Sequence, residues 1–172
     1  MNFKKFFDFA NDLMFKRCLD STDEVLISIF YDYLKWLNIS EEKGNIERVK
    51  AIYVKNLLNS KPAKIYAVID ENILEISSVE NLIKGAENEH ITEIKSREYI
   101  TQIKIYKKDR IEKIEFTGIN TTYQGVVDLN ANNRARIIFD NGDVFEFSNI
   151  DDANDNWRNK YTEMMLQFIL QL

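Results

Sequence analysis

The sequence has few of the residues that interrupt or cross-link a chain. Its 172 residues include 5 Gly, 1 Pro and 1 Cys. Scarce Gly and Pro exclude collagen-like and linker-rich chains. Because Cys18 is alone, no disulfide can form within the chain, and this favours a reducing compartment. We therefore predict a cytoplasmic location.

Long uncharged runs are also missing. None approaches the 18 residues that a membrane-spanning helix needs, so the sequence predicts no transmembrane segment. Asp8, Asn11 and Asp12 interrupt the apolar residues that follow the first lysines, which argues against a signal peptide. Both observations agree with the cytoplasmic location.

Positive charge is in short supply throughout. The formal net charge is −5 and the pI is about 5.1. Basic and acidic residues balance over residues 1–60, and acidic residues are in excess over 61–150 and 151–172. A surface for nucleic acid needs Lys and Arg gathered against phosphates. We therefore expect no nucleic-acid partner.

What the sequence does contain is apolar: 45% of residues are hydrophobic and 12% aromatic. Such a chain can bury a core, so general disorder is excluded. Ile and Asn are numerous, at 22 and 18 residues. We interpret this bias as that of an AT-rich genome, such as a low-GC Gram-positive bacterium or its phage.

The first third of the chain has helical spacing. Apolar residues from Phe3 to Met14 recur at steps of three and four. Ser21 and Glu24 form a capping box before a second helix that runs to Leu37. Residues 46–57 fit a third helix, although 51–54 fit a strand equally well. We therefore predict a helical extension over residues 1–60.

After Pro62 the apolar period changes to two, which indicates strands. Seven short strands are predicted, at residues 65–69, 73–76, 91–94, 99–106, 111–116, 134–139 and 144–147. Asn141-Gly142 is a strong hairpin signal, and residues 107–110 are interpreted as a second hairpin tip. Residues 123–129 are a candidate for one more short strand.

The chain closes with an amphipathic helix near residues 151–171. Its apolar stripe must pack onto something, and the preceding antiparallel sheet is the available surface. Carboxylates at the start of this helix oppose the positive end of its dipole. The stripe is Trp157, Tyr161, Met164, Met165, Phe168 and Leu172, and the carboxylates are Asp151, Asp152 and Asp155.

Seven antiparallel strands followed by one amphipathic helix resemble the pleckstrin-homology superfold in its bacterial form, over about residues 63–172. Trp157 stands where that family has a tryptophan early in the helix, and Glu98–Ile103 is similar to a strand of bacterial members. The resemblance implies an α+β chain in which residues 61–172 form a partly open PH-like barrel plugged by the helix. The acidic turn at residues 70–72 would repel a phosphorylated head group, so we expect no phosphoinositide binding.

The sequence shows no recognisable pattern of catalytic or metal-binding residues. His90 has no second histidine or nucleophile nearby and is interpreted as a loop residue. The segment from Asp128 resembles a calcium loop but lacks its glycine and its final glutamate. Cys18 follows Arg17, yet shares a helical face with Met14 and is interpreted as a small apolar residue. We therefore predict no catalytic residue, metal or cofactor.

Two groups of residues are candidate contact surfaces. One is aromatic, near the N-terminus, and the other is the single basic cluster. The alternative interpretation of the basic cluster is a charged hairpin tip that discourages aggregation. The first group is Phe3, Phe6 and Phe7, and the second is Lys104, Lys107, Lys108 and Arg110, with Lys113 beside it.

These observations favour a non-catalytic interaction module that binds another protein or its own copy. One alternative is a small enzyme or ligand-binding protein with an acidic and aromatic site, which a pocket of convergent carboxylates would support. A further alternative is an inhibitor or immunity-type protein from a phage or mobile element. Its acidity would complement a basic partner.

Overall fold

The structure is a computed structural model that describes residues 3–15, 21–40, 42–57, 62–88, 91–122, 124–125, 127–129, 131–153 and 157–172. Within these ranges, side chains are described except at residues 3, 13–15, 21–22, 78–88 and 91–100.

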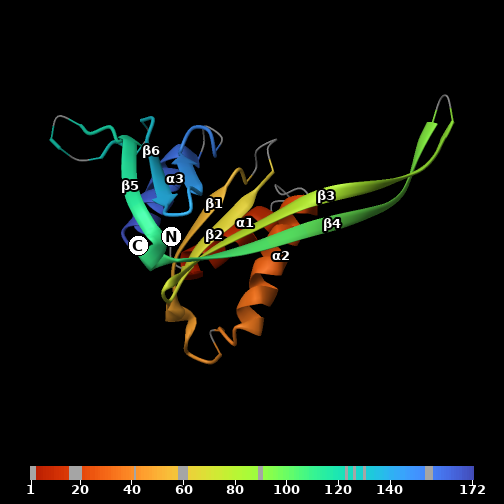
Figure 1. Ribbon diagram of the computed structural model, residues 1–172, viewed down its shortest axis with the longest axis horizontal. Helices are drawn as coiled ribbons and strands as arrows, with labels where there is room; N and C mark the ends of the chain where they lie inside the picture. The colour runs from red at the N-terminus through yellow and green to blue at the C-terminus, as the bar shows by residue number, and fades with distance from the viewer. Residues whose placement is uncertain are drawn as a thin grey trace.

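Two antiparallel sheets form the centre of the molecule (Figure 1). The four-stranded sheet has the order β1-β2-β3-β4, and the three-stranded sheet has the order β5-β6-β7. The predicted α+β class is confirmed, but the sheets do not close into a barrel. The strands of the first sheet are β1 (Val49–Lys55), β2 (Lys64–Ile69), β3 (Asn72–Asn88) and β4 (Ile91–Lys107), and those of the second are β5 (Ile111–Gly118), β6 (Arg134–Phe139) and β7 (Val144–Ser148).

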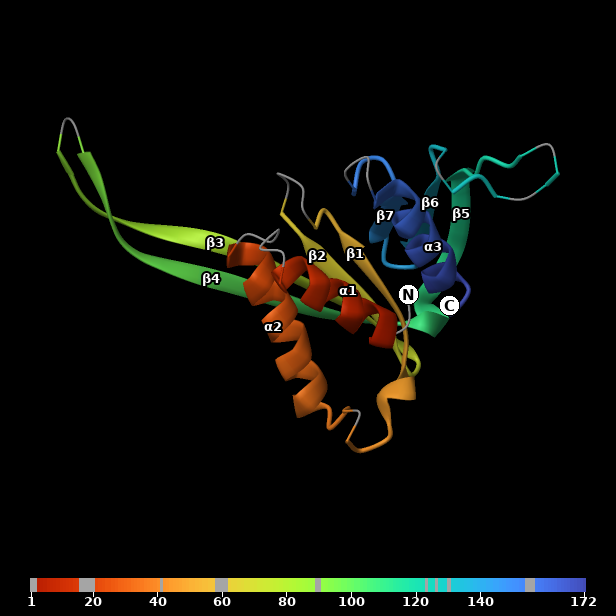
Figure 2. The ribbon, with the colours of Figure 1, turned by 180° about the vertical axis from the view of Figure 1, so that it is seen from behind.

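Helices cover the four-stranded sheet on one face. Figure 2 shows α1 (Phe3–Phe15) and α2 (Ser21–Trp36) lying across it, and α2 contacts β2, β3 and β4. The third helix, α3 (Arg158–Ile169), packs against β1 and β7. Two short 3-10 turns, η1 (Ile46–Arg48) and η2 (Lys108–Arg110), lead into β1 and β5.

Aromatic rings fill the space between the two sheets. Tyr66 of β2 packs on Phe145 of β7 with ring centroids 4.8 Å apart, and Tyr106 of β4 packs on Phe139 of β6 at 4.6 Å. α3 closes the side between β1 and β7, where its Phe168 meets Phe147 at 5.5 Å. The predicted packing of the final helix on an antiparallel sheet is thus confirmed.

The segment from residue 107 to residue 110 is not a hairpin tip. β4 and β5 belong to different sheets, so the turn η2 is a corner that carries the chain from one sheet to the other. The Asn141-Gly142 hairpin is confirmed, because β6 pairs with β7 and Gly142 has a φ of 86°. That positive φ is the reason for a glycine at this position.

The third helix expected within residues 46–57 is wrong, and the strand alternative holds. β1 occupies residues 49–55 and pairs with β2 from Val49↔Ile69 to Lys55↔Lys64. The expected boundary at residue 60 therefore falls between two hydrogen-bonded strands. α1, α2 and both sheets contribute to one buried apolar cluster.

β3 and β4 are much longer than the predicted strands. The predicted strands at 91–94 and 99–106 are one strand, β4, and its pairing with β3 extends to Asn88↔Ile91. β2 pairs with β3 only as far as Ser77, so the outer parts of β3 and β4 form a two-stranded ribbon that projects from the sheet (Figure 1). Residues 123–129 were a candidate for one more strand. Among their described residues, Val127 forms an isolated bridge with Thr121, and no pairing longer than this is present.

Candidate functional site

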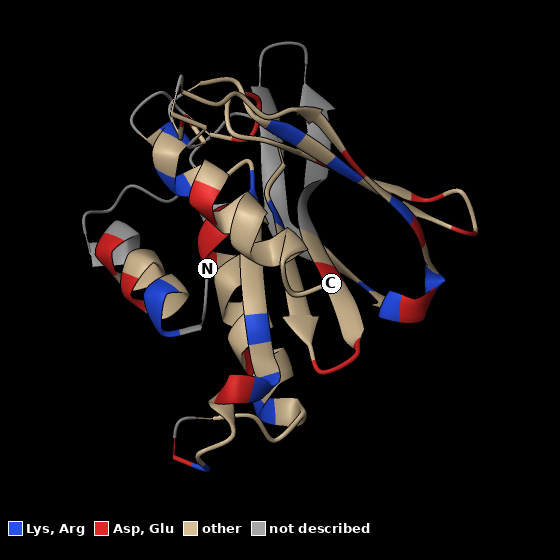
Figure 3. Ribbon diagram, turned by 90° about the vertical axis from the view of Figure 1, so that its left-hand side faces the viewer, with Lys and Arg blue, Asp and Glu red and all other residues tan. Residues whose placement is uncertain are grey.

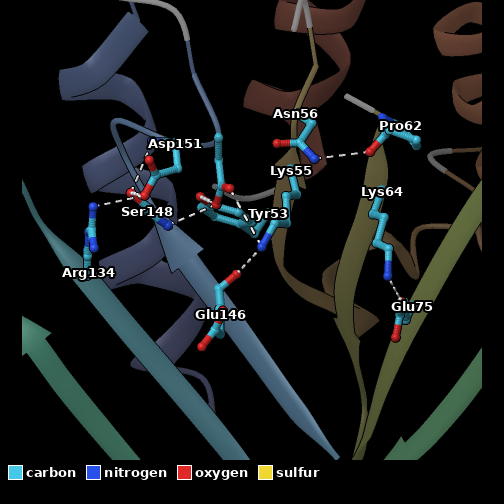
Figure 4. A network of polar contacts seen from close by, with 11 residues as sticks. Tyr53, Lys55, Asn56, Pro62, Lys64, Glu75, Arg134, Glu146, Ser148 and Asp151 are labelled. Carbon is cyan, nitrogen blue, oxygen red and sulfur yellow. Dashed lines mark hydrogen bonds and ion pairs between the residues drawn. The ribbon is translucent and has the colours of Figure 1, made fainter. Parts of the chain in front are cut away.

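Two hollows in the structure bring together side chains that the sequence keeps apart. The first, here called the polar crevice, is a cavity of about 440 Å³ between the end of β1 and strands β6 and β7. Figure 4 shows the polar contacts around it. Its charged and polar lining consists of Lys55, Asn56, Thr117, Arg134, Arg136, Glu146, Ser148, Asp151 and Asp152.

A buried carboxylate lies at the inner end of the polar crevice. Asp152 is buried, and its Oδ2 accepts hydrogen bonds from the Tyr53 hydroxyl at 2.7 Å and from the Ser148 N–H at 2.8 Å. Its backbone carbonyl accepts a third from the Asn56 N–H at 3.1 Å. Asp152 therefore ties the segment after β7 to the middle and the end of β1.

Burial dominates the electrostatics of this pair. It raises the pKa of Asp152, and the Lys55 ammonium, 3.6 Å from Oδ1, opposes this effect. Burial, with the nearby Asp152 charge, raises the pKa of Tyr53 well above its usual value. The hydrogen bond from Tyr53 to Asp152 joins β1 to the segment after β7.

The aspartates before α3 do not have the role expected of them. The helix begins at Arg158, six residues after Asp152, so Asp152 does not face the helix dipole. Asp151 instead pairs with Arg134 at 3.1 Å and accepts from the Ser148 hydroxyl at 2.9 Å. Asp155 lies outside the described residues.

The second hollow, here called the α2–β4 groove, is a cavity of about 370 Å³ on the helix-covered side of the sheet. Trp36 of α2 is 78% exposed, and Ile105 of β4 is 58% exposed. Tyr33 is partly buried and its ring lies 5.8 Å from that of Trp36. Lys107 lines the same groove. The sequence did not single out Trp36, because nothing local shows that one residue of an amphipathic helix is left uncovered.

The predicted aromatic surface is divided between core and surface. Phe6 is fully buried against Phe30, at 5.6 Å between centroids, so it belongs to the core and cannot form a contact surface. Phe7 is 40% exposed and lies on Tyr31. The side chain of Phe3 is outside the described part of the structure.

The predicted basic cluster is spread over β4, the η2 corner and β5, and acidic residues are interleaved with it (Figure 3). Arg110 pairs with Asp140 at 2.8 Å and Lys113 with Glu115 at 2.5 Å. Lys104, Lys107 and Lys108 have no ion pair within the described part of the chain. These three lysines remain available to an acidic group.

The remaining candidates add no site within the described part of the structure. His90 and Cys18 lie outside the described residues. Asn133, in the former calcium-loop candidate, is fully buried and donates to the Asp128 carbonyl at 2.7 Å, which is a structural role. Among the described residues, no group of three or more His, Cys, Asp or Glu is placed to hold a metal, and no helix is long and apolar enough to cross a membrane.

Comparison with known proteins adds no relative: no family model, no curated protein and no solved structure matches this chain.

Proposed function

We propose that the protein is a non-catalytic interaction module whose partner protein binds at the α2–β4 groove. The observation that carries this proposal is the exposure of Trp36 and Ile105 on the two sides of one groove. A tryptophan buries a large apolar area when it is covered, and such residues dominate the energetics of protein interfaces. Trp36 contributes little to the fold because most of its surface faces solvent.

The position of β4 supports the same surface. β4 is the last strand of its sheet, and among the described strands none pairs with its outer edge. Ile103 and Ile105 are both exposed on the helix side, while Tyr106, the residue after Ile105, packs toward the other sheet. An edge strand with apolar side chains can accept an extended segment of another chain.

Charge indicates the chemistry of that segment. Lys107 lies in the groove and Lys108 follows it at the η2 corner, whereas Lys104 lies on the opposite face of β4. We infer a partner segment that combines apolar side chains with carboxylates, because unlike charges favour encounter and correct register.

The PH-like interpretation and the cytoplasmic location are part of this proposal. The PH-like interpretation is supported by seven strands in two packed antiparallel sheets, with a terminal amphipathic helix at their open side. The resemblance was recognised over about residues 63–172; β1 begins earlier, at Val49, and the helices α1 and α2 precede it.

The test compares two equally exposed apolar side chains. Trp36 is 78% and Leu170 79% exposed, and Leu170 lies just after α3, outside the α2–β4 groove. Immobilised wild-type protein would be used to isolate partners from an extract of the source cells. Free wild-type protein and the Leu170→Ala variant should compete for a bound partner, and the Trp36→Ala variant should compete at least about tenfold less well.

Light scattering on the purified chain gives the second arm. A dimer that dissociates in the Trp36→Ala variant but not in Leu170→Ala identifies a second copy as the partner. A monomer with no partner recovered, or equal competition by both variants, would contradict the proposal.

A further inference from the structure

The outer half of β3 has one edge without a neighbouring strand. β2 pairs with β3 as far as Ser77, whereas β4 pairs with it as far as Asn88. Among the described strands, none pairs with residues 78–88 on the side that β2 leaves. Figure 2 shows the resulting two-stranded ribbon projecting beyond the helices and the rest of the sheet. Its β3 edge is therefore open to another strand.

A ribbon of two strands needs a further strand or a core to be stable. A two-stranded hairpin that has neither is marginal in water. At about 3.3 Å per residue, residues 78–88 extend up to about 36 Å beyond the last pair with β2. The backbone N–H and C=O groups along an open edge are a template for pairing with another chain. A third strand at this edge would stabilise the ribbon.

The sequence of this edge is complementary to itself in an antiparallel register. Glu80 and Lys84 stand symmetrically on the two sides of Leu82. When two copies of β3 run antiparallel with Leu82 on the two-fold axis, residue 80 of each copy stands opposite residue 84 of the other. Unlike charges at directly opposed positions stabilise a sheet, and like charges destabilise it. Two-fold symmetry makes this pair occur twice.

The neighbouring symmetric registers do not pair these charges. With residue 81 on the axis, Glu80 stands opposite Leu82, and with residue 83 on the axis, Lys84 stands opposite Leu82. In the Leu82 register residue 78 faces residue 86, so the pairing begins directly after Ser77, where β2 ends. The length of the open edge and its charge pattern therefore agree on one register.

An irregularity in the ribbon keeps the second copy clear of β2. The register of β3 against β4 shifts between Lys84 and Glu87, and such irregularities bend a strand. Figure 1 shows the outer end of the ribbon turning away from the direction of its inner part. Beyond residue 86, each β3 strand therefore leaves the shared sheet instead of running into β2 of the other copy.

We propose that two copies of the chain associate through the β3 edges of their ribbons. Residues 78–86 of each copy pair antiparallel about Leu82 and give a continuous sheet with the order β4-β3-β3-β4. A second copy always brings the complementary charges in this register, which an unrelated strand need not do. These residues are not part of the α2–β4 groove, so the dimer leaves the groove of each copy to its own partner.

Charge reversal tests the register, with the dissociation constant of the dimer measured by analytical ultracentrifugation. Glu80→Lys and Lys84→Glu each place like charges opposite one another twice per dimer, so each should raise this constant at least about tenfold. The combined variant Glu80→Lys/Lys84→Glu restores unlike pairs and should return the constant to within about threefold of wild type. Glu112→Lys makes the same charge change at an exposed position of β5 and should leave the constant unchanged.

Cross-linking tests the position of the axis without changing a charge. In a Cys18→Ser background, which removes the single native thiol, a short bifunctional maleimide should join Leu82→Cys to its counterpart in a second copy. Ser78→Cys is the control on the same strand. Residue 78 faces residue 86, so its two copies are about 26 Å apart and should not be joined. A mixture of Ser78→Cys and Ala86→Cys should be joined.

The outcomes separate this interface from the α2–β4 groove. A ribbon dimer should persist unchanged in Trp36→Ala. A wild-type chain that stays monomeric at the highest concentration reached, or a dimer that neither charge reversal weakens, would overturn the proposal. A weakened dimer that the combined variant does not restore would also overturn it. A dimer lost in Trp36→Ala but kept in Glu80→Lys would assign self-association to the groove, against the ribbon interface and in favour of the proposed function.

Discussion

The two edge strands of the four-stranded sheet, β1 and β4, differ in how far other elements cover them. At the β1 edge, α3 covers the strand, Tyr53 is fully buried, and its hydroxyl is bonded to Asp152. At the β4 edge, Ile103 and Ile105 are exposed beside the exposed Trp36. Both edges carry apolar residues, but within the described part of the chain only the β1 edge has buried apolar residues with a helix packed over them. The difference separates side chains that hold the fold from side chains that are available to a partner.

The largest expected effect is at the covered edge. Phe168 is fully buried and packs on Phe147. Phe168→Ala should lower the free energy of unfolding by about 3–5 kcal/mol, as large-to-small core substitutions do. Chemical denaturation measures this loss, and Leu170→Ala on the same segment is the control, with an expected change within about 0.5 kcal/mol. A loss below about 1 kcal/mol for Phe168→Ala would show that α3 does not seal this edge.

The polar contacts of the covered edge come next. Asp152→Ala leaves the Tyr53 hydroxyl and the Ser148 N–H without their acceptor. Each buried unsatisfied group costs about 1–3 kcal/mol, so a loss of about 2–6 kcal/mol is expected for the two groups. A double-mutant cycle with Tyr53→Phe should show a favourable coupling energy between the two side chains. Additive losses would mean that the hydrogen bond contributes nothing to stability.

A smaller effect appears as pH dependence. Burial raises the pKa of folded Asp152 above its unfolded value of 3.8, so its contribution is fully present below pH 3.8 and is lost as the pH rises through the folded pKa. The stability of wild type relative to Asp152→Asn should therefore fall as the pH increases from 3.8.

Asp70→Asn supplies a control of opposite sign. The hydrogen bond from Arg48 lowers the pKa of Asp70, so its contribution is present above pH 3.8 and is lost as the pH falls through the lowered value. Denaturation curves of the wild type and both variants over this range would measure the two trends. If the stability relative to each variant changed with pH in the same direction, the direction of the pKa shift assigned to Asp152 or to Asp70 would be wrong.

The smallest effect is expected at the uncovered edge. Trp36→Ala should change the free energy of unfolding by no more than about 0.5 kcal/mol, because the side chain is mostly exposed. The measurement is chemical denaturation at a protein concentration where the chain is monomeric. A loss above about 2 kcal/mol would place Trp36 among the residues that hold the fold.

The sequence patterns predicted some elements well, and the reasons are local. β6 and β7 alternate buried and exposed side chains and are joined by Asn141-Gly142, so period and turn chemistry agree. The sequence left helix and strand open for β1 because four consecutive residues, Ala51–Val54, are buried, and a strand covered on both faces shows no alternation. The η2 corner was predicted as a hairpin tip because both kinds of turn contain polar residues. Whether the next strand pairs within the same sheet depends on contacts that are distant in the sequence.

The candidate sites were harder to predict for the same reason. Tyr53 and Asp152 are 99 positions apart, and their hydrogen bond depends on how the segment after β7 crosses the end of β1. Asp152 looked like a helix-start carboxylate because acidic residues are common there. Phe6 and Phe7 are neighbours of the same type, and only the packing of α1 on α2 assigns one to the core and the other to the surface.

Site-specific photo-cross-linking tests the central claim most directly. A photoreactive phenylalanine analogue at position 36 would be compared with the same analogue at position 170, where exposure is equal. In the source cells, position 36 should form one defined cross-linked product, either with another protein or with a second copy, and position 170 should not. No product at position 36, or the same products at both positions, would contradict the claim that the uncovered edge is an interaction surface.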